Sequence, residues 1–167
     1  DAVIDVTNLP AGEVEEARTL FGAATRNILA AEERAGVPHH ILLSIVGVDR
    51  IEGPPHYAGK RLQEELVVAG PIPFTILRAT QFHVSMLMTI RTIAKLPVVP
   101  VPAGFKFQPV DAGEVAARLV ELALGKPTGP VPDIGGPRTY EMAEPARSDA
   151  GPTPPPRPPA PAEPRGK

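Results

Sequence analysis

Short apolar runs alternate with longer amphipathic stretches along this chain, and the alternation constrains the fold more than any other feature. Three runs rich in β-branched and aliphatic residues predict buried strands at 2–6, 40–46 and 74–78. Stretches with a helical pattern of apolar residues follow them, at 14–35, 57–69 and 84–95. The middle run is apolar on both faces, as strands covered by helices on both sides are. The sequence therefore predicts an α/β protein with right-handed parallel crossovers.

The pattern continues in shorter pieces after residue 95. Two extended segments, a helix and a last extended piece are predicted, at 98–101, 105–110, 111–125 and 132–136. Asp111 and Glu114 have the spacing of a capping box, in which the first side chain accepts hydrogen bonds from backbone N–H groups. Together these elements predict a Rossmann-like layered domain over residues 1–144.

Residues 145–167 differ in composition from the rest of the chain. They hold nine of the 23 prolines and no Val, Ile, Leu, Phe or Met. A segment of this kind cannot bury enough apolar surface to offset the entropy lost on ordering, so we expect a disordered, polyproline-prone tail. Matches to P-x-x-P at 152–155 and 155–158 leave open that the tail is a ligand for a protein partner.

Charge and cysteine content exclude several classes of function. The formal net charge is -2, and the chain has no cysteine. A nucleic-acid binder needs a basic surface to neutralise phosphates, and a disulfide framework needs cysteine. No apolar run reaches the roughly 20 residues of a membrane-spanning helix, and the first residues lack the features of a signal peptide. We expect a cytoplasmic protein that binds neither nucleic acid nor membrane.

The glycines do not form a phosphate-binding loop. None of the 15 glycines belongs to a G-x-G-x-x-G pattern, the loop whose N–H groups and helix N-terminus hold a pyrophosphate. The segment from Gly53 to Arg61 is similar to a P-loop, but it has one residue too many between its glycines and Arg where Ser or Thr must stand. The four histidines lack the spacing of a helical metal site, so no metal is expected.

One group of residues has the chemistry needed to act on a carbonyl. Ser44 lies near the end of its predicted strand, and His56, Tyr57 and Lys60 follow at the start of the next predicted helix. Ligands of open parallel sheets bind beyond the carboxyl ends of the strands. There Ser44 can orient a carbonyl, His56 or Tyr57 can transfer a proton, and Lys60 can hold a ribose. The alternative is that Ser44 caps the strand end and Lys60 is an exposed helix lysine.

Several segments carry a family pattern. They lie at 24–37, 40–47, 56–64, 74–82, 107–116 and 133–137, and Ile-Leu-Arg-Ala-Thr-Gln-Phe at 76–82 is the most specific piece. These segments resemble the NmrA-like group of the atypical short-chain dehydrogenase/reductases, which bind NAD(P)H in a Rossmann fold. The resemblance covers residues 1–144.

The resemblance implies hydride transfer between a nicotinamide cofactor and a small carbonyl or quinone-like substrate. The cofactor is NAD or NADP, with NADP preferred. Thr7 and Asn8 are placed near the adenosine by this resemblance, and Ser44 and Lys60 near the ribose and the reacting carbonyl. The residues placed along the nicotinamide are Arg78, Ala79, Thr80, Gln81 and Phe82.

The chain departs from the family pattern at the proton donor. A Tyr-x-x-x-Lys spacing that ends at Lys60 needs Tyr at position 56, where this chain has His56 with Tyr57 beside it. His56 or Tyr57 is therefore the candidate donor, because histidine also transfers protons near neutral pH. A non-catalytic NAD(P)H sensor, which binds the cofactor and changes its affinity for a partner, is the alternative function.

The resemblance aligns the first six residues with the fourth strand of the family. Strands one to three and the glycine-rich loop are then expected to be absent, and an inactive fragment or a frameshifted product is a further alternative. The uncovered strand is mainly apolar and has no proline or lysine to protect it as natural sheet edges are protected, so we expect self-association through it. Val14, Phe21 and Ile28 are expected to be exposed for the same reason.

Overall fold

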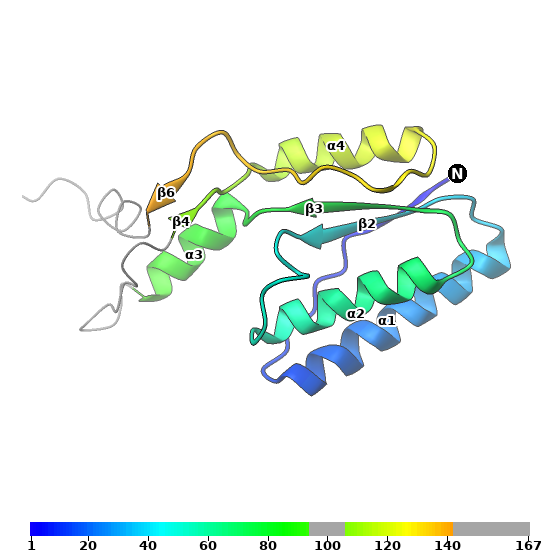
Figure 1. Cartoon of the computed structure of the whole chain (residues 1–167), viewed down its shortest axis with the longest axis horizontal. Helices are drawn as coiled ribbons and strands as arrows, with labels where there is room; N and C mark the ends of the chain where they lie inside the picture. Colours follow the sequence, from blue (N-terminus) through cyan, green and yellow to red (C-terminus); the bar gives the residue numbers. More distant parts are fainter. Residues whose placement is uncertain (94–105, 142–167) are drawn as a thin grey trace, which may run out of the picture.

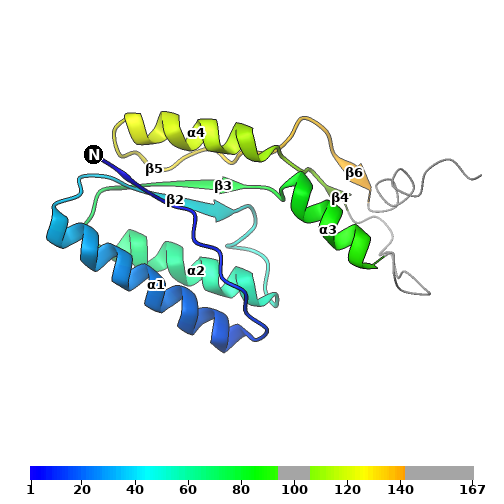
Figure 2. The same cartoon turned by 180° about the vertical axis from the view of Figure 1, so that it is seen from behind.

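The computed structural model describes residues 1–93 and 106–141, which form a parallel sheet of four strands with helices on both faces. The strands lie in the order β1-β2-β3-β5, with the bounds Val3–Asp5, His40–Ile45, Phe74–Ala79 and Gly129–Pro130. A separate antiparallel pair joins β4 (Lys106–Phe107) to β6 (Tyr140–Glu141). Within the described part of the chain, β1 pairs with β2 alone and forms an edge of the sheet (Figure 2).

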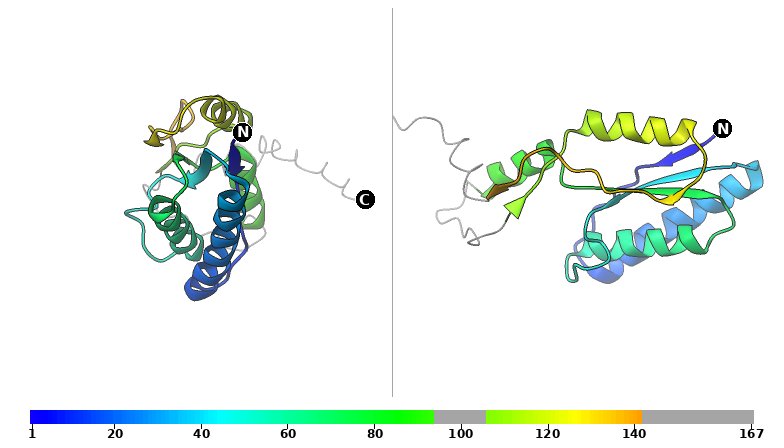
Figure 3. Two further views of the ribbon diagram at one scale, coloured as in Figure 1. Left: turned by 90° about the vertical axis from the view of Figure 1, so that its right-hand side faces the viewer. Right: turned by 45° about the horizontal axis from the view of Figure 1, so that its top comes forward.

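Helices α1 (Val14–Ala35) and α2 (Pro55–Ala69) cover one face of the sheet, and α4 (Ala112–Leu124) covers the other (Figures 1 and 3). Helix α3 (His83–Ile93) extends beyond the carboxyl end of β3, beside β4 and β6 (Figure 1). This arrangement confirms the predicted Rossmann-like α/β class.

The predicted elements differ from the observed ones mainly in the second half of the chain. Among the described residues of the predicted extended segment at 105–110, two form β4, and Val110 makes a single bridge to Phe82. The piece at 132–136 is not a strand: Ile134 makes a single bridge to Ala79, and β5 lies earlier in the chain. The predicted strand at 98–101 and the predicted tail at 145–167 lie outside the described residues.

Successive residues of the central strands pack on opposite faces, because side chains alternate along a strand. Ile41 of β2 belongs to a buried cluster with Val115 of α4. The next residue, Leu42, belongs to the cluster on the other face with Val67 of α2. The two apolar layers explain why β2 is apolar on both faces in the sequence.

Helices α1 and α2 pack closely at two glycines. A Cβ added at Gly59 would meet the ring of Phe21, and one at Gly22 would lie 3.0 Å from Leu62 Cδ2. Phe21 is fully buried against α2, so the expectation that it is exposed is wrong. Helix α2 covers Phe21, whereas Val14 at the start of α1 is 37% exposed.

The ends of two helices follow the sequence signals. Gly36 ends α1 in the left-handed conformation, with φ 66°, which glycine adopts without strain. Asp111 caps α4, and its Oδ1 accepts hydrogen bonds from the N–H groups of Gly113 (2.8 Å) and Glu114 (3.3 Å). Both features confirm the predicted boundaries. Within the described ranges, no helix has the length and apolar character needed to cross a bilayer.

Candidate functional site

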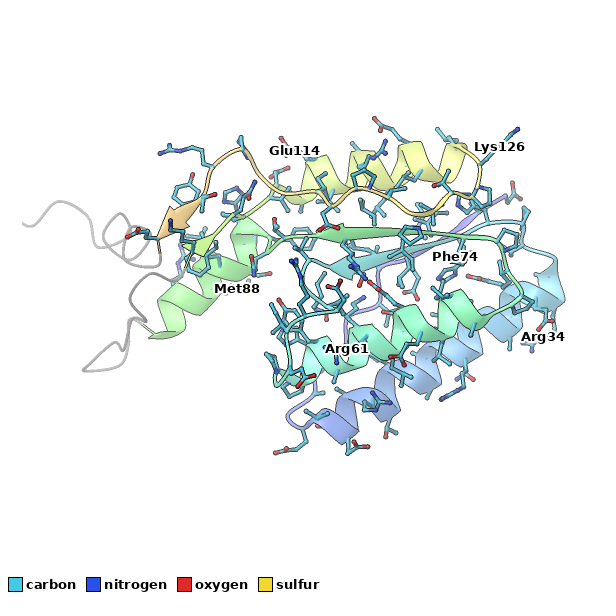
Figure 4. The ribbon with its side chains drawn as sticks, viewed as in Figure 1. Arg34, Arg61, Phe74, Met88, Glu114 and Lys126 are labelled. Atoms are coloured by element: carbon cyan, nitrogen blue, oxygen red, sulfur yellow. The ribbon has the colours of Figure 1, made fainter. Side chains whose placement is uncertain are left out.

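The candidate site lies at the carboxyl edge of the sheet, at the end where α2 begins. Strands β2 and β3 both point toward this end (Figure 1). Figure 4 shows Arg61 on the first turns of α2 at this end, while Arg34 and Lys126 lie at the opposite end of the molecule. The predicted residues Thr7 and Lys60 meet here, beside the residue that precedes Ser44.

Lys60 is a buried lysine that joins two strands. It is 5% exposed, and its ammonium donates hydrogen bonds to the carbonyl oxygens of Thr7 (2.8 Å) and Leu43 (2.9 Å). A third bond goes to Oε1 of Gln63, at 2.9 Å. An ammonium has three N–H donors, so each of them has an acceptor in the protein. Lys60 is therefore not the exposed helix lysine of the alternative interpretation, and it ties the residues after β1 to β2.

The surroundings of Lys60 make its proton easier to lose. Burial lowers the pKa of Lys60 to about 8, against the attraction of the Asp5 and Glu64 carboxylates, which favours the charged form. The ammonium also lies 5.6 Å from the centre of the Phe21 ring. Lys60 is then mainly charged at neutral pH, and it loses its proton more readily than an exposed lysine.

Ser44 has a buried hydroxyl without a hydrogen-bond partner among the described residues. It is 1% exposed, and its neighbour across the sheet is Arg78 of β3. An unsatisfied buried hydroxyl costs about 1–3 kcal/mol, so such a group calls for a specific explanation. A ligand oxygen or nitrogen is one group that would satisfy it.

His56 and Tyr57 lie one helical turn before Lys60. Their rings are in contact, with centroids 4.7 Å apart and planes inclined by 57°. The surrounding protein lowers the pKa of His56 and raises the pKa of Tyr57, in both cases through partial loss of solvent. At neutral pH His56 is therefore mainly neutral, and Tyr57 keeps its proton.

Arg78 does not point toward the loop that follows β3. Its guanidinium makes a bidentate pair with Glu64 of α2, at 3.0 and 2.7 Å, and an ion pair with Asp49 at 3.3 Å. The Glu64 hydrogen bonds raise the pKa of Arg78, so it stays charged. The arginine fastens α2 to the sheet and to the loop after β2.

The segment after β3, also predicted to lie along the nicotinamide, is hydrogen-bonded to residues far along the chain. The N–H of Thr80 donates to the Ile134 carbonyl at 3.0 Å, and the Thr80 hydroxyl donates to the carbonyl of Gln108. The carbonyl of Gln81 accepts from Val110 at 2.9 Å. Ala79 is buried, Phe82 is half-buried, and Gln81 is exposed. Asn8, predicted near the adenosine, is also exposed.

Sequence reasoning missed the polar groups at the other end of the sheet. His40 is fully buried, and its Nδ1 lies 2.9 Å from both carboxylate oxygens of Glu32, which is 4% exposed. His39 beside it bonds Thr75 Oγ1 at 2.9 Å, and burial lowers the pKa of His39. The helical pattern of α1 gave no signal for Glu32, because charged residues are expected on the solvent side.

A shallow hollow of about 380 Å³ lies between α2 and the loop after β2. Its lining includes Asp49, Glu64 and Val68, but neither Ser44 nor Lys60. The hollow is therefore separate from the candidate site. The described residues contain no group of three or more side chains that could hold a metal ion.

Comparison with known proteins identifies the fold. No protein-family model and no curated protein matches the sequence. The Bordetella bronchiseptica enzyme WbmG in complex with NAD matches with a TM-score of 0.66 and 15% identity, over 92% of this chain and 57% of that one. A short-chain dehydrogenase/reductase superfamily protein from Agrobacterium tumefaciens with bound NAD gives 0.65 and 16%, over 89% and 64%. The fold is that of these NAD-bound proteins.

A third solved structure gives the same result. A nucleoside-diphosphate-sugar epimerase from Staphylococcus aureus matches with a TM-score of 0.67 and 16% identity, over 88% of this chain and 51% of that chain. The present chain spans between 51% and 64% of the length of these three structures. At these identities the match concerns the fold, and function has to be argued from the site.

Proposed function

We propose that this chain supplies the nicotinamide side of an NAD(P)-dependent oxidoreductase of the NmrA-like short-chain dehydrogenase/reductase type. The proposed substrate is a small carbonyl or quinone-like molecule. One observation carries the proposal: at the carboxyl edge of a parallel sheet, where sheets of this kind bind ligands, Lys60 bonds the residue before Ser44, and the Ser44 hydroxyl has no partner among the described residues. The fold shared with NAD-bound proteins supports the class of cofactor.

The residues present fit such a cofactor to different degrees. Ser44 fits by its chemistry, because a ligand oxygen that reached its buried hydroxyl would satisfy it. Lys60 fits only if a ribose hydroxyl replaces one of its three protein acceptors. The sequence has no glycine-rich loop for a pyrophosphate, so binding through the nicotinamide half is expected to dominate. A bound nicotinamide would supply the hydride, while the residues bind, orient and move a proton.

Proton donation is assigned to Tyr57. The phenol keeps its proton at neutral pH and lies three residues before Lys60 on α2. His56 is the poorer donor, because its lowered pKa leaves little imidazolium at pH 7. In this assignment the charge of Lys60 favours the phenolate that donation leaves behind.

A second function, the non-catalytic NAD(P)H sensor, has a specific observation in its favour. All three donors of Lys60 are taken by the protein, and the position four residues before it is His56 rather than Tyr. A site of this kind can bind the cofactor without turnover. The two functions are separated by whether bound cofactor is oxidised.

Nicotinamide mononucleotide and adenosine monophosphate are the probes for the binding site. Saturation-transfer NMR on the full chain is expected to give a stronger signal on the nicotinamide ring than on the adenine, because the buried hydroxyl that a ligand would satisfy, that of Ser44, is placed on the nicotinamide side. Ser44→Ala is expected to weaken the nicotinamide signal at least threefold without loss of stability. Thr19→Ala, on an exposed position of α1, is the control and changes neither. Equal signals from Ser44→Ala and Thr19→Ala would remove Ser44 from the site.

Turnover separates the enzyme from the sensor. Oxidation of NADPH is followed with a set of quinones and small aldehydes, in the full chain and in Tyr57→Phe. If the chain is an enzyme, we expect turnover that Tyr57→Phe reduces by about 10²-fold or more. The nicotinamide NMR signal should be unchanged in this variant. Nicotinamide contact without oxidation of any substrate supports the sensor. Absence of both signals contradicts the two functions together.

A further inference from the structure

A chain of buried polar groups runs from β1 to Lys60 through α2. Asp5 of β1 is 3% exposed, and Gln63 of α2 is fully buried. The Gln63 amide donates from Nε2 to Asp5 Oδ2 at 2.8 Å and accepts from Lys60 at Oε1 at 2.9 Å. The other Asp5 oxygen accepts the N–H of Thr7 at 2.8 Å. The Lys60 ammonium closes the loop through the Thr7 carbonyl.

The chemistry of these groups fixes the orientation of the Gln63 amide. A carboxylate only accepts hydrogen bonds and an ammonium only donates them. The amide of Gln63 therefore has its nitrogen toward Asp5 and its oxygen toward Lys60, and the reverse orientation would break both bonds. Each partner of the amide is itself held by backbone groups, so the side chain has one arrangement.

We propose that Asp5 and Gln63 are positioning residues for Lys60, forming a carboxylate–amide relay that holds its ammonium at the carboxyl ends of β1 and β2. The relay explains how a buried ammonium is tolerated where every direct acceptor is neutral. The carboxylates that favour its charged form are those of Asp5, which reaches it through the amide, and of Glu64, which is engaged by Arg78. Removing one partner of a buried charge is costly, so the three residues act together.

The relay deepens the proposed function, and its importance for nucleotide binding rests on that function. The geometry itself does not depend on a nucleotide. A test without any nucleotide therefore separates the relay from the proposed function: the relay can stand if nicotinamide contact is absent, and it can fail while that contact is present.

The test exchanges the carboxylate and the amide. Asp5→Asn alone loses one hydrogen bond whichever way the new amide turns. The amide nitrogen of the asparagine must face either the Thr7 N–H or Gln63 Nε2, and two donors cannot bond each other. Gln63→Glu alone places a second carboxylate against Asp5. In the double variant, the new amide accepts from Thr7 and donates to the new carboxylate, which accepts from Lys60. All three bonds are restored by the exchange.

Urea unfolding of the full chain is the first measurement. Each single variant is expected to raise the unfolding equilibrium constant about tenfold or more, and the double variant to return within about threefold of the original chain. The control is the double variant with Asp5→Asn and Glu65→Gln, since Glu65 is an exposed carboxylate two residues after Gln63 on α2. The two changes in its unfolding equilibrium constant should multiply, because the residues are not in contact through the relay. If the effects of the Asp5 and Gln63 variants also multiply, the relay does not exist.

The titration of Lys60 is the second measurement, because a purely structural role would not move it. Lysine side-chain ¹³C shifts are followed against pH, with the Lys60 signal assigned from its loss in Lys60→Arg. The double variant is expected to raise the Lys60 midpoint by about one pH unit, since a carboxylate now bonds the ammonium directly. An unchanged midpoint in a folded double variant would overturn the positioning role.

Discussion

Replacing Gly59 by alanine tests the contact that seats α2 on α1. The new Cβ would lie 2.9 Å from both Cε2 and Cγ of Phe21, and closer still to Cδ2. Phe21 is fully buried, so its ring cannot turn out into solvent without opening the contact between the helices. Carbon atoms separated by less than about 3.5 Å repel each other, and the two helices therefore have to move apart.

Two opposing effects determine how much Gly59→Ala changes the free energy of unfolding. Overpacking of a filled core costs about 1–3 kcal/mol. Alanine is better than glycine inside a helix by about 1 kcal/mol. Because the clash involves three atoms of one rigid ring, we expect the upper part of the first range, and a net loss of about 1–2 kcal/mol in the free energy of unfolding.

Gly22→Ala is the matched control, since Gly22 lies in α1 at the same helix pair. Its Cβ would meet Leu62 Cδ2 at 3.0 Å and Arg26 Nη1 at 3.1 Å, which are ends of flexible side chains. Urea unfolding followed by circular dichroism is expected to show no loss for Gly22→Ala. The double variant with Phe21→Leu and Gly59→Ala should lose less free energy of unfolding than the sum of the losses in the two single variants. If the free energies of unfolding of Gly59→Ala and Gly22→Ala agree within about 0.5 kcal/mol, the close contact between Gly59 and Phe21 does not exist.

Three further predictions concern the ends and edges of the sheet. Burial lowers the pKa of His39 below 6.5, so the unfolded state takes up the proton first and stability falls as the pH drops through and below 6.5. His39→Gln should flatten this profile in urea unfolding. Asp111→Ala should cost about 0.5–2 kcal/mol through loss of the α4 cap, measured in the same way. Val6→Lys beside the β1 edge should reduce self-association in light scattering, whereas Val120→Lys, equally exposed on α4, should not.

The layered fold could be predicted because its signals are local. The alternation of strand and helix patterns, the left-handed glycine at position 36 and the cap at Asp111 each occupy a few consecutive residues, and the structure confirms them. The burial of Phe21 could not be predicted in the same way. It depends on a glycine 38 positions away that lets α2 approach, and a helical pattern alone does not say which neighbour will cover a side chain.

The polar contacts of the site were not predictable from spacing, although the residue types were. Lys60 bonds groups at positions 7, 43 and 63, which only the folded sheet brings together. Arg78 was predicted along a nicotinamide, but its side chain is on the α2 side, paired with Glu64. A strand places alternate residues on opposite faces, so a motif quoted as one continuous string is divided between two sides of the sheet.

The two central residues of the site differ in what their removal would reveal. Replacement of Lys60 leaves three acceptors without their donor, two of them backbone carbonyls that hold β1 and β2 together, so any loss of nucleotide contact would be mixed with a loss of structure. Ser44 has no such role, because its hydroxyl bonds none of the described residues. Ser44→Ala removes an unsatisfied group and is expected to keep or raise stability. A weaker nicotinamide signal in that variant can therefore be assigned to binding itself, which makes Ser44 the residue on which the proposed function is decided.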